Sequence, residues 1–306
     1  MHREPTRSHP LSMFFLRTIA VVSLLTPISP LACARKDPSA PRPNETTVTF
    51  VKRAPSIGRL TIEESSTSIR LSGEARAPGH SSVAMTTESI ERERKREEVL
   101  AVFERIITKK KITYEQLERR EYRDGKAVPT PVSPLLGHSY IAETKNSMLV
   151  LTSASGTPVS EAERKELSRR LANLGKPDPF LEGIPDGPVR ADQAAPQMGG
   201  GFLEIFEGGE QGADVGNVDV RFTGTRGRPE GPCGVFAFTL GVQMAGEPRL
   251  ALQLRGEFLV RVADGAPIEF EMAGPARLAG REKVEGVDVA LDGTGAMRAS
   301  WRVTYL

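Results

Sequence analysis

The C-terminal hundred residues alternate between apolar and polar side chains with a period of two. The apolar positions are Leu250, Leu252, Leu254, Phe258, Val260 and Val262 in one long run, and Met297, Ala299, Trp301, Val303 and Tyr305 in another. This period buries one face of a β-strand and exposes the other, which is typical of antiparallel sheets. The sequence therefore predicts a meander of long antiparallel strands.

Shorter segments with the same alternation extend this prediction along the chain. They cover residues 218–222, 236–244, 268–272 and 287–291 in the C-terminal part, and residues 47–51, 60–64, 68–72, 135–141 and 148–151 in the N-terminal part. Asp264-Gly265 and Asp292-Gly293-Thr294-Gly295 fall between apolar runs, and these residue types accept the backbone conformations of hairpin turns. We therefore expect tight turns at both places.

The segment 88–122 is rich in Glu, Arg and Lys, residues that favour a helix by propensity alone. Its apolar residues form no clean helical stripe, and Ile112 and Tyr114 alternate ahead of Asp124-Gly125 instead. We therefore predict a long and highly charged hairpin here, with a helix as the alternative.

One helix has clear sequence signals at 160–174. Ser160 and Glu163 form a capping-box pair, and the stripe Leu167, Leu171 and Leu174 leads to a terminating Gly175. The segment 183–196 that follows contains three prolines and two glycines in 14 positions, and we expect it to be a surface connector.

These elements together predict a mainly β (α+β) fold. About seven strands of about ten residues would make a sheet roughly 34 Å by 33 Å, whereas a helix of about fourteen residues is only about 21 Å long. One helix cannot cover the apolar face, so we expect a half-barrel or a two-layer sheet. A hydrophobic trough would then be lined by inner-face residues, for which the candidates are Phe236, Phe238, Leu252, Leu254, Phe258 and Trp301.

The first 33 residues have the pattern of an export signal. Arg3, Arg7 and Arg17 precede a short apolar stretch at 19–25, and Met13 is an alternative start. A Pro-rich segment at 34–46 without large apolar residues indicates a flexible tether. We therefore expect a single β-rich domain at 47–306, and leave open a division into halves 47–157 and 198–306 around the helix.

The run Ser29-Pro30-Leu31-Ala32-Cys33 resembles the lipobox of bacterial lipoproteins. The resemblance implies that the Cys33 thiol is acylated and anchors the protein in a membrane, and Ala34 after it resembles an outer-membrane address. The alternative is ordinary cleavage after Ala32-Cys33-Ala34, which would give a soluble periplasmic protein.

The region after the tether resembles uncharacterised secreted lipoproteins of predatory and soil bacteria, through the segments 133–140 and 184–189. A long curled sheet behind a lipobox is also loosely similar to the periplasmic lipoprotein carriers, which shuttle acyl chains across the periplasm. Neither resemblance implies a catalytic residue.

Composition and motifs argue against several function classes. The net charge is only +2, and the cluster Lys109-Lys110-Lys111 lies among as many acids, so we expect no nucleic-acid partner. With four His and two Cys, we expect no metal and no cofactor. Cys233 lacks a local basic partner, and His138 belongs to no recognised catalytic motif, so we expect no catalytic residues.

These observations predict a non-enzymatic, envelope-anchored lipoprotein that binds a hydrophobic small molecule or an envelope protein. A structural or interaction module with a fully packed core is the first alternative. An envelope hydrolase is the second, because fold alone does not exclude chemistry.

Overall fold

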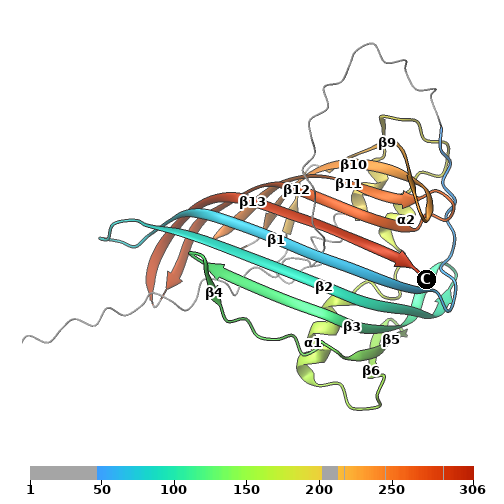
Figure 1. Cartoon of the computed structure of the whole chain (residues 1–306), viewed down its shortest axis with the longest axis horizontal. Coiled ribbons are helices and arrows are strands. Elements are labelled where there is room, and N and C mark those ends of the chain that lie inside the picture. Colours follow the sequence, from blue (N-terminus) through green and yellow to red (C-terminus); the bar gives the residue numbers. More distant parts are fainter. Residues whose placement is uncertain (1–46, 202–212, 217, 245, 285) are drawn as a thin grey trace, which may run out of the picture.

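A single antiparallel sheet dominates the protein (Figure 1). The structure is a computed structural model that describes residues 47–201, 213–216, 218–244, 246–284 and 286–306. The sheet has 13 strands in the order β6-β5-β3-β2-β1-β13-β12-β11-β10-β9-β7, with β4 beside β3 and β8 beside β10. This confirms the predicted mainly β fold with long antiparallel strands.

The strands are β1 (Leu60–Arg76), β2 (Val83–Phe103), β3 (Ile106–Arg123), β4 (Lys126–Val128), β5 (Ser139–Lys145), β6 (Met148–Ser153), β7 (Gln193–Ala194), β8 (Ala213–Val215), β9 (Asp219–Arg228), β10 (Gly231–Met244), β11 (Arg249–Arg261), β12 (Pro267–Val284) and β13 (Val287–Tyr305). The helices are α1 (Glu161–Arg170) and α2 (Pro179–Gly183), followed by the short 3₁₀ turn η1 (Pro196–Met198). None of the helices in the described part of the chain has the length and apolar composition needed to cross a bilayer.

The first and last long strands pair with each other in the middle of the sheet. The antiparallel register of β1 and β13 runs from Thr61 opposite Tyr305 to Arg76 opposite Ala290. The segments 60–64 and 68–72 are thus parts of one strand, and the N-terminal and C-terminal strands form one continuous sheet.

The charged segment 88–122 forms a hairpin, as predicted, from β2 and β3. Opposite charges meet across the strands, and the Arg94 guanidinium contacts both Glu64 on β1 and Glu115 on β3. The turn lies at Glu104, whose φ is +56°, and Asp124-Gly125 forms the next turn into β4 with φ values of +50° and +74°. Cross-strand pairing therefore overrides the helix propensity of these residues.

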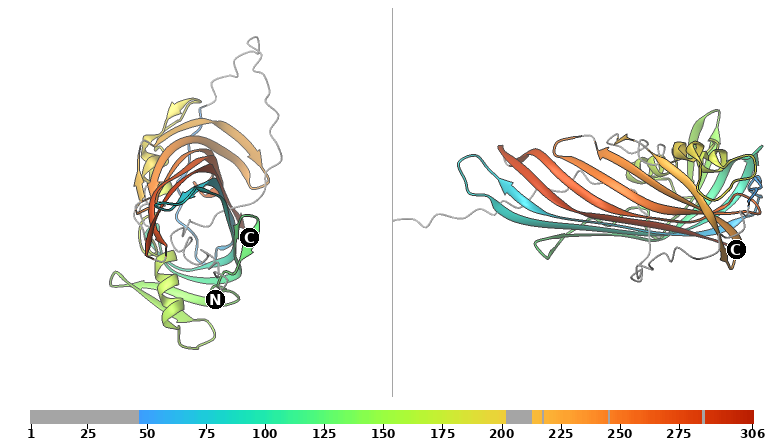
Figure 2. Two further views of the ribbon diagram at one scale, coloured as in Figure 1. Left: turned by 90° about the vertical axis from the view of Figure 1, so that its left-hand side faces the viewer. Right: turned by 90° about the horizontal axis from the view of Figure 1, so that it is seen from above.

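The predicted turn at 292–295 is wrong, because these residues lie inside β13. Gly295 faces β1, where a Cβ would overlap the carbonyl oxygen of Arg70. Gly274 on β12 and Gly256 on β11 are equally crowded, against the carbonyls of Gln253 and Glu271. The sheet is strongly curled (Figure 2). These glycines allow neighbouring strands to approach closely, and glycine kinks are one way in which a sheet curves. The turn at Asp264-Gly265 is confirmed, with a Gly265 φ of +73°.

The prediction of a strand at 47–51 is wrong, because these residues form only an isolated bridge, between Val48 and Val189. The segment 183–196 is exposed over most of its length, as expected of a surface connector. Three of its apolar residues, Ile184, Val189 and Ala195, are nevertheless at most 2% exposed and attach the segment to the sheet.

The predicted helix start is confirmed, and the helix is shorter than expected. Ser160 caps α1 with the full capping box to Glu163, but the helix ends at Arg170. Leu167 and Leu171 are buried and Leu174 is partly buried, so the leucine stripe packs beyond the last helical turn. This stripe forms a small core with residues of the neighbouring strands and loop: Ile112, Tyr114, Leu135, Tyr140, Ala142 and Leu151.

The signal segment 1–33, its Cys33 and the tether 34–46 lie outside the described residues.

Candidate functional site

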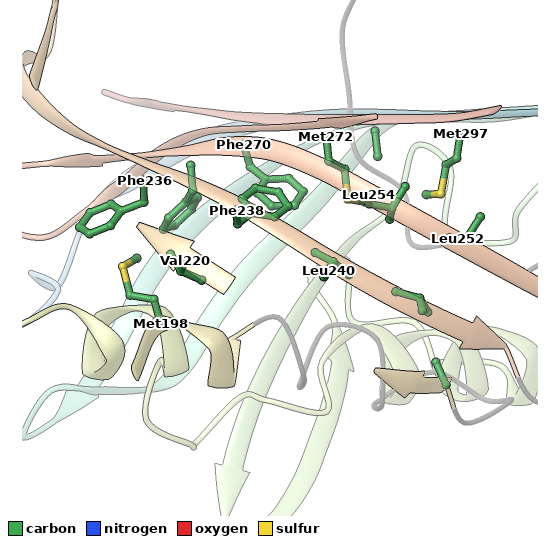
Figure 3. Packing of buried hydrophobic residues seen from close by; sticks show 14 of the residues in the cluster. Met198, Val220, Phe236, Phe238, Leu240, Leu252, Leu254, Phe270, Met272 and Met297 are labelled. Atoms are coloured by element: carbon green, nitrogen blue, oxygen red, sulfur yellow. The ribbon is translucent and has the colours of Figure 1, made fainter. Parts of the chain in front are cut away.

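The predicted ligand-contact residues converge on one face of the curled sheet. We call this the inner face, and define it by the side chains that share a side with Phe238 on β10, Phe258 on β11, Phe270 on β12 and Trp301 on β13. Five candidates, Phe236, Phe238, Leu252, Leu254 and Phe258, are at most 2% exposed and belong to one apolar cluster. Figure 3 shows how Phe236, Phe238, Leu252 and Leu254 gather with Phe270 and Met272.

One end of the inner face is covered by residues outside the main strands, from the segment 47–51, from α2 and from the chain that follows α2. The Phe50 ring lies 5.5 Å from that of Phe236, and the Phe180 ring of α2 lies 4.8 Å from that of Phe258. Leu181, Ile184 and Met198 join the same cluster. Aromatic and aliphatic side chains therefore fill this end of the inner face by close packing.

Trp301 lies beside the apolar cluster and is only half-buried. It faces Phe270 across the β12–β13 ladder, and its indole Nε1–H donates to Glu63 Oε2 on β1 at 3.2 Å. Val303, two residues on, is 2% exposed. Tyr305 differs from the prediction: it packs with a second small cluster, Cys233, Val235, Leu259 and Ile268.

The inner face changes character from apolar to charged along the sheet. One row of directly paired residues runs from Phe270 through Trp301, Ser65 and Glu93 to Leu117. The next row runs from Met272 through Ala299, Thr67 and Glu91 to Arg119. In these two rows β12 and β13 contribute apolar groups, β1 contributes hydroxyls, and β2 contributes carboxylates, whereas farther along β1 the side chains of Ile69 and Leu71 belong to the apolar cluster.

The charged part of the inner face is internally paired. Lys95 Nζ lies 3.0 Å from Glu63 Oε2 and 2.9 Å from Glu97 Oε1, and Lys110 Nζ lies 2.8 Å from Glu97 Oε2. Burial alone would lower the pKa of Lys95, but the carboxylates of Glu63 and Glu97 outweigh it and raise that pKa well above its usual value. Burial likewise opposes ionisation of Glu97, yet Lys110 and Lys95 lower its pKa to about 2.

Helix α1 extends this network. Arg170 forms ion pairs with Glu93 on β2 and with Glu166 one turn earlier, and its guanidinium lies 5.6 Å from the centre of the Tyr114 ring. Glu93 is 7% exposed, so Arg170 neutralises a carboxylate that has lost most of its water.

Sequence reasoning missed this charged part of the site. The signal was present as hydroxyl and acidic residues at alternate positions, Ser65 and Thr67 on β1 and Glu91, Glu93 and Glu97 on β2. Charged residues occupy both faces of β2 and β3. The sequence alone therefore does not show which of these side chains point to the inner face.

His138 and Cys233 have the following surroundings. His138 Nδ1 lies 3.0 Å from Glu163 Oε1, and the Tyr140 hydroxyl donates to the same oxygen. Hydrogen bonds from Tyr140, Ser160 and His138 lower the pKa of Glu163 to about 2.

Cys233 is fully buried, and its thiol contacts the Gly231 carbonyl at 3.5 Å. Burial raises the pKa of this thiol, which disfavours the reactive thiolate.

Among the hollows that the described residues form, two lie around Tyr122. One of about 300 Å³ is lined by β3 and β4 residues such as Arg119 and Thr130, and one of about 160 Å³ is lined by residues that include Arg70 and Glu88. Neither is lined by the six predicted contact residues, by His138 or by Cys233. Within the described ranges, no group of three or more His, Cys, Asp or Glu side chains is placed to hold a metal ion.

No known protein family and no curated protein matches this sequence. Among solved structures, an outer membrane channel from Pseudomonas putida F1 is similar at 11% identity and a TM-score of 0.20, over 82% of this chain and 97% of that chain. A LolA superfamily protein from Nitrosomonas europaea has 7% identity and a TM-score of 0.12, over 76% and 84%. The attachment invasion locus protein Ail of Yersinia pestis has 8% identity and a TM-score of 0.11, over 80% and 99%. TM-scores this low do not define a shared fold.

Proposed function

We propose that this protein is an envelope-anchored, non-enzymatic lipoprotein whose inner face binds a hydrophobic ligand. The observation that carries the proposal is the continuous apolar cluster on the inner face of β9 to β13, which extends well beyond the end packed by α2 and Phe50. The longer helix α1 packs on the β3–β5–β6 side and contributes no residue to this cluster. An apolar interior of this kind, enclosed by a curled sheet, suits an acyl chain.

Tryptophan fluorescence tests the binding proposal directly, because Trp301 is the only tryptophan in the chain. Acyl chains that carry bromine quench indole emission on contact. We expect brominated chains to quench Trp301 and to protect the protein against unfolding, as a ligand of the native state does. Native mass spectrometry of protein extracted from its own envelope should show retained lipid.

A matched pair of variants places the ligand on one face. In a Trp301→Phe background, Phe238→Trp puts the reporter on the inner face, and Thr239→Trp puts it on the exposed side of the same strand. Quenching should be strong for the first and weak for the second. Equal quenching of both, or of neither, would favour the alternative of a structural or interaction module with a packed core.

Membrane anchoring is a separate part of the proposal and rests on Cys33. The lipobox-like run ahead of it and the proline-rich segment behind it support acylation and an outer-membrane location. Wild-type protein should partition into detergent with a mass increase that fits acyl chains, whereas Cys33→Ala should be soluble in the periplasm. Equal solubility of the two would instead favour cleavage after Ala34.

A further inference from the structure

Near Ser65 and Thr67, strand β1 lies between two chemically different parts of the inner face. On one side, Trp301 and Ala299 of β13 continue into the apolar cluster, and on the other side Glu93 and Glu91 of β2 begin the charged network. A core that only fills its own interior has no need for this division, because burying ion pairs costs more free energy than burying apolar groups of similar size.

Ser65 lies at this boundary with an unused hydroxyl. It is 7% exposed, and its Oγ has no hydrogen-bond partner. Its direct neighbours in the sheet are the Trp301 indole on one side and the Glu93 carboxylate on the other. Glu93 is occupied by Arg170, and the Trp301 N–H is occupied by Glu63. A buried hydroxyl without a partner costs free energy unless another molecule supplies one.

The charges near Ser65 indicate what kind of group would fit. Lys95 is shared by Glu63 and Glu97, and Glu93 is neutralised by Arg170. A charged group placed beside Ser65 would disturb this balance and would bring no compensating partner. An uncharged group with hydroxyls can donate to or accept from Ser65 without adding charge.

We propose that the inner face binds an amphiphile with an uncharged, hydroxyl-bearing head, whose head hydrogen-bonds Ser65 while its acyl chain lies along β12 and β13. This inference rests on the proposed function and adds the position and chemistry of the head.

The experiment compares two brominated lipids, dibromostearoyl glycerol and methyl dibromostearate, by quenching of Trp301 in the full chain. Both carry the same acyl chain, and only the first has free hydroxyls. Ser65→Ala removes the proposed partner, and Ser66→Ala is the matched control because Ser66 points to the opposite face of the same strand. Removing an unpaired hydroxyl leaves no broken hydrogen bond behind, so Ser65→Ala should fold as the wild type does.

We expect Ser65→Ala to weaken binding of the glyceride about 3- to 10-fold, as loss of one hydrogen bond does, and to leave the methyl ester unaffected. Ser66→Ala should change neither affinity, and anionic dibromostearate should bind more weakly than the glyceride. An unchanged glyceride affinity in Ser65→Ala, or an equal loss for the methyl ester, overturns the proposed head position while acyl binding stands. If no brominated chain quenches wild-type Trp301, the proposed function fails with it.

Discussion

The indole N–H of Trp301 donates to the carboxylate of Glu63, although the two residues are 238 positions apart in the chain. The contact crosses the β1–β13 pair, which joins the N-terminal and C-terminal strands. Glu63 also pairs with Lys95, so the hydrogen bond joins the edge of the apolar cluster to the charged network. Trp301 therefore has an apolar ring surface against the core and a polar edge toward the charged network, an arrangement that suits its amphipathic side chain.

Removal of the Trp301 side chain should destabilise the protein moderately. We expect Trp301→Ala to lower the free energy of unfolding by about 2–3 kcal/mol, below the cost at a fully buried tryptophan because the ring is only half-buried. Urea denaturation followed by circular dichroism measures this. The neighbouring Arg302→Ala, on the exposed side of β13, serves as the control and should cost less than about 0.5 kcal/mol. Equal losses would show that the two faces of β13 are assigned wrongly.

The buried ion pair between α1 and the sheet should be sensitive to loss of one partner. Arg170→Met leaves Glu93 charged and 7% exposed without its guanidinium, and we expect a loss of about 3 kcal/mol in the free energy of unfolding. The double variant Arg170→Met with Glu93→Leu should recover most of this, since it removes the stranded charge. Arg164→Ala, an exposed arginine on the same helix, controls for helix propensity. A double variant as unstable as the single one would contradict the argument.

The glycines inside the curled strands give a further prediction. Gly274→Ala places a Cβ against the Gln253 carbonyl and Gly295→Ala places one against Arg70, so both variants must push neighbouring strands apart. We expect each to cost about 3 kcal/mol, the upper end of the usual range for overpacking, or to prevent folding. Gly227→Ala on β9 is the matched control, because no atom lies within 4 Å of its added Cβ. Thermal unfolding of the three variants measures the difference, and comparable stabilities would show that the curl does not depend on glycine.

These glycines also show where sequence analysis was insufficient. The alternation around Leu252 and Trp301 predicted strands and their inner faces, because period-two burial is a local property of one strand. The local sequence predicts a turn at Gly293 and Gly295, since the same residue type serves tight turns and close approach of strands. Which of the two applies depends on the backbone of β1, more than 200 positions away, and that is not visible in the local sequence.

The candidate site was predictable only in its apolar half. Phe238 and Leu254 stand out by hydrophobicity, and the structure places both in the inner-face cluster. Glu93 and Lys95 have charged residues before and after them in the sequence. Only the register of the strands shows that Glu93 lies opposite Ser65 of β1 and that Lys95 lies opposite Tyr114 of β3. The charged half therefore needed the sheet pairing before it could be recognised.

Acidification should weaken the attachment of α1 through Glu163. Its folded pKa of about 2 lies below the ordinary value of 4.5, because Tyr140, Ser160 and His138 hydrogen-bond the carboxylate. A depressed pKa means that this contribution to stability is fully present above about pH 4.5 and is lost as the pH falls toward 2. We expect Glu163→Gln to reduce the decline in stability of the wild type across that window, measured by urea denaturation at successive pH values. Glu161, an exposed acid in the same helical turn, provides the control. Glu161→Gln should leave the decline in stability across this pH range unchanged. If Glu163→Gln follows the wild-type curve, the hydrogen bonds at the start of α1 do not hold this carboxylate in its ionised form.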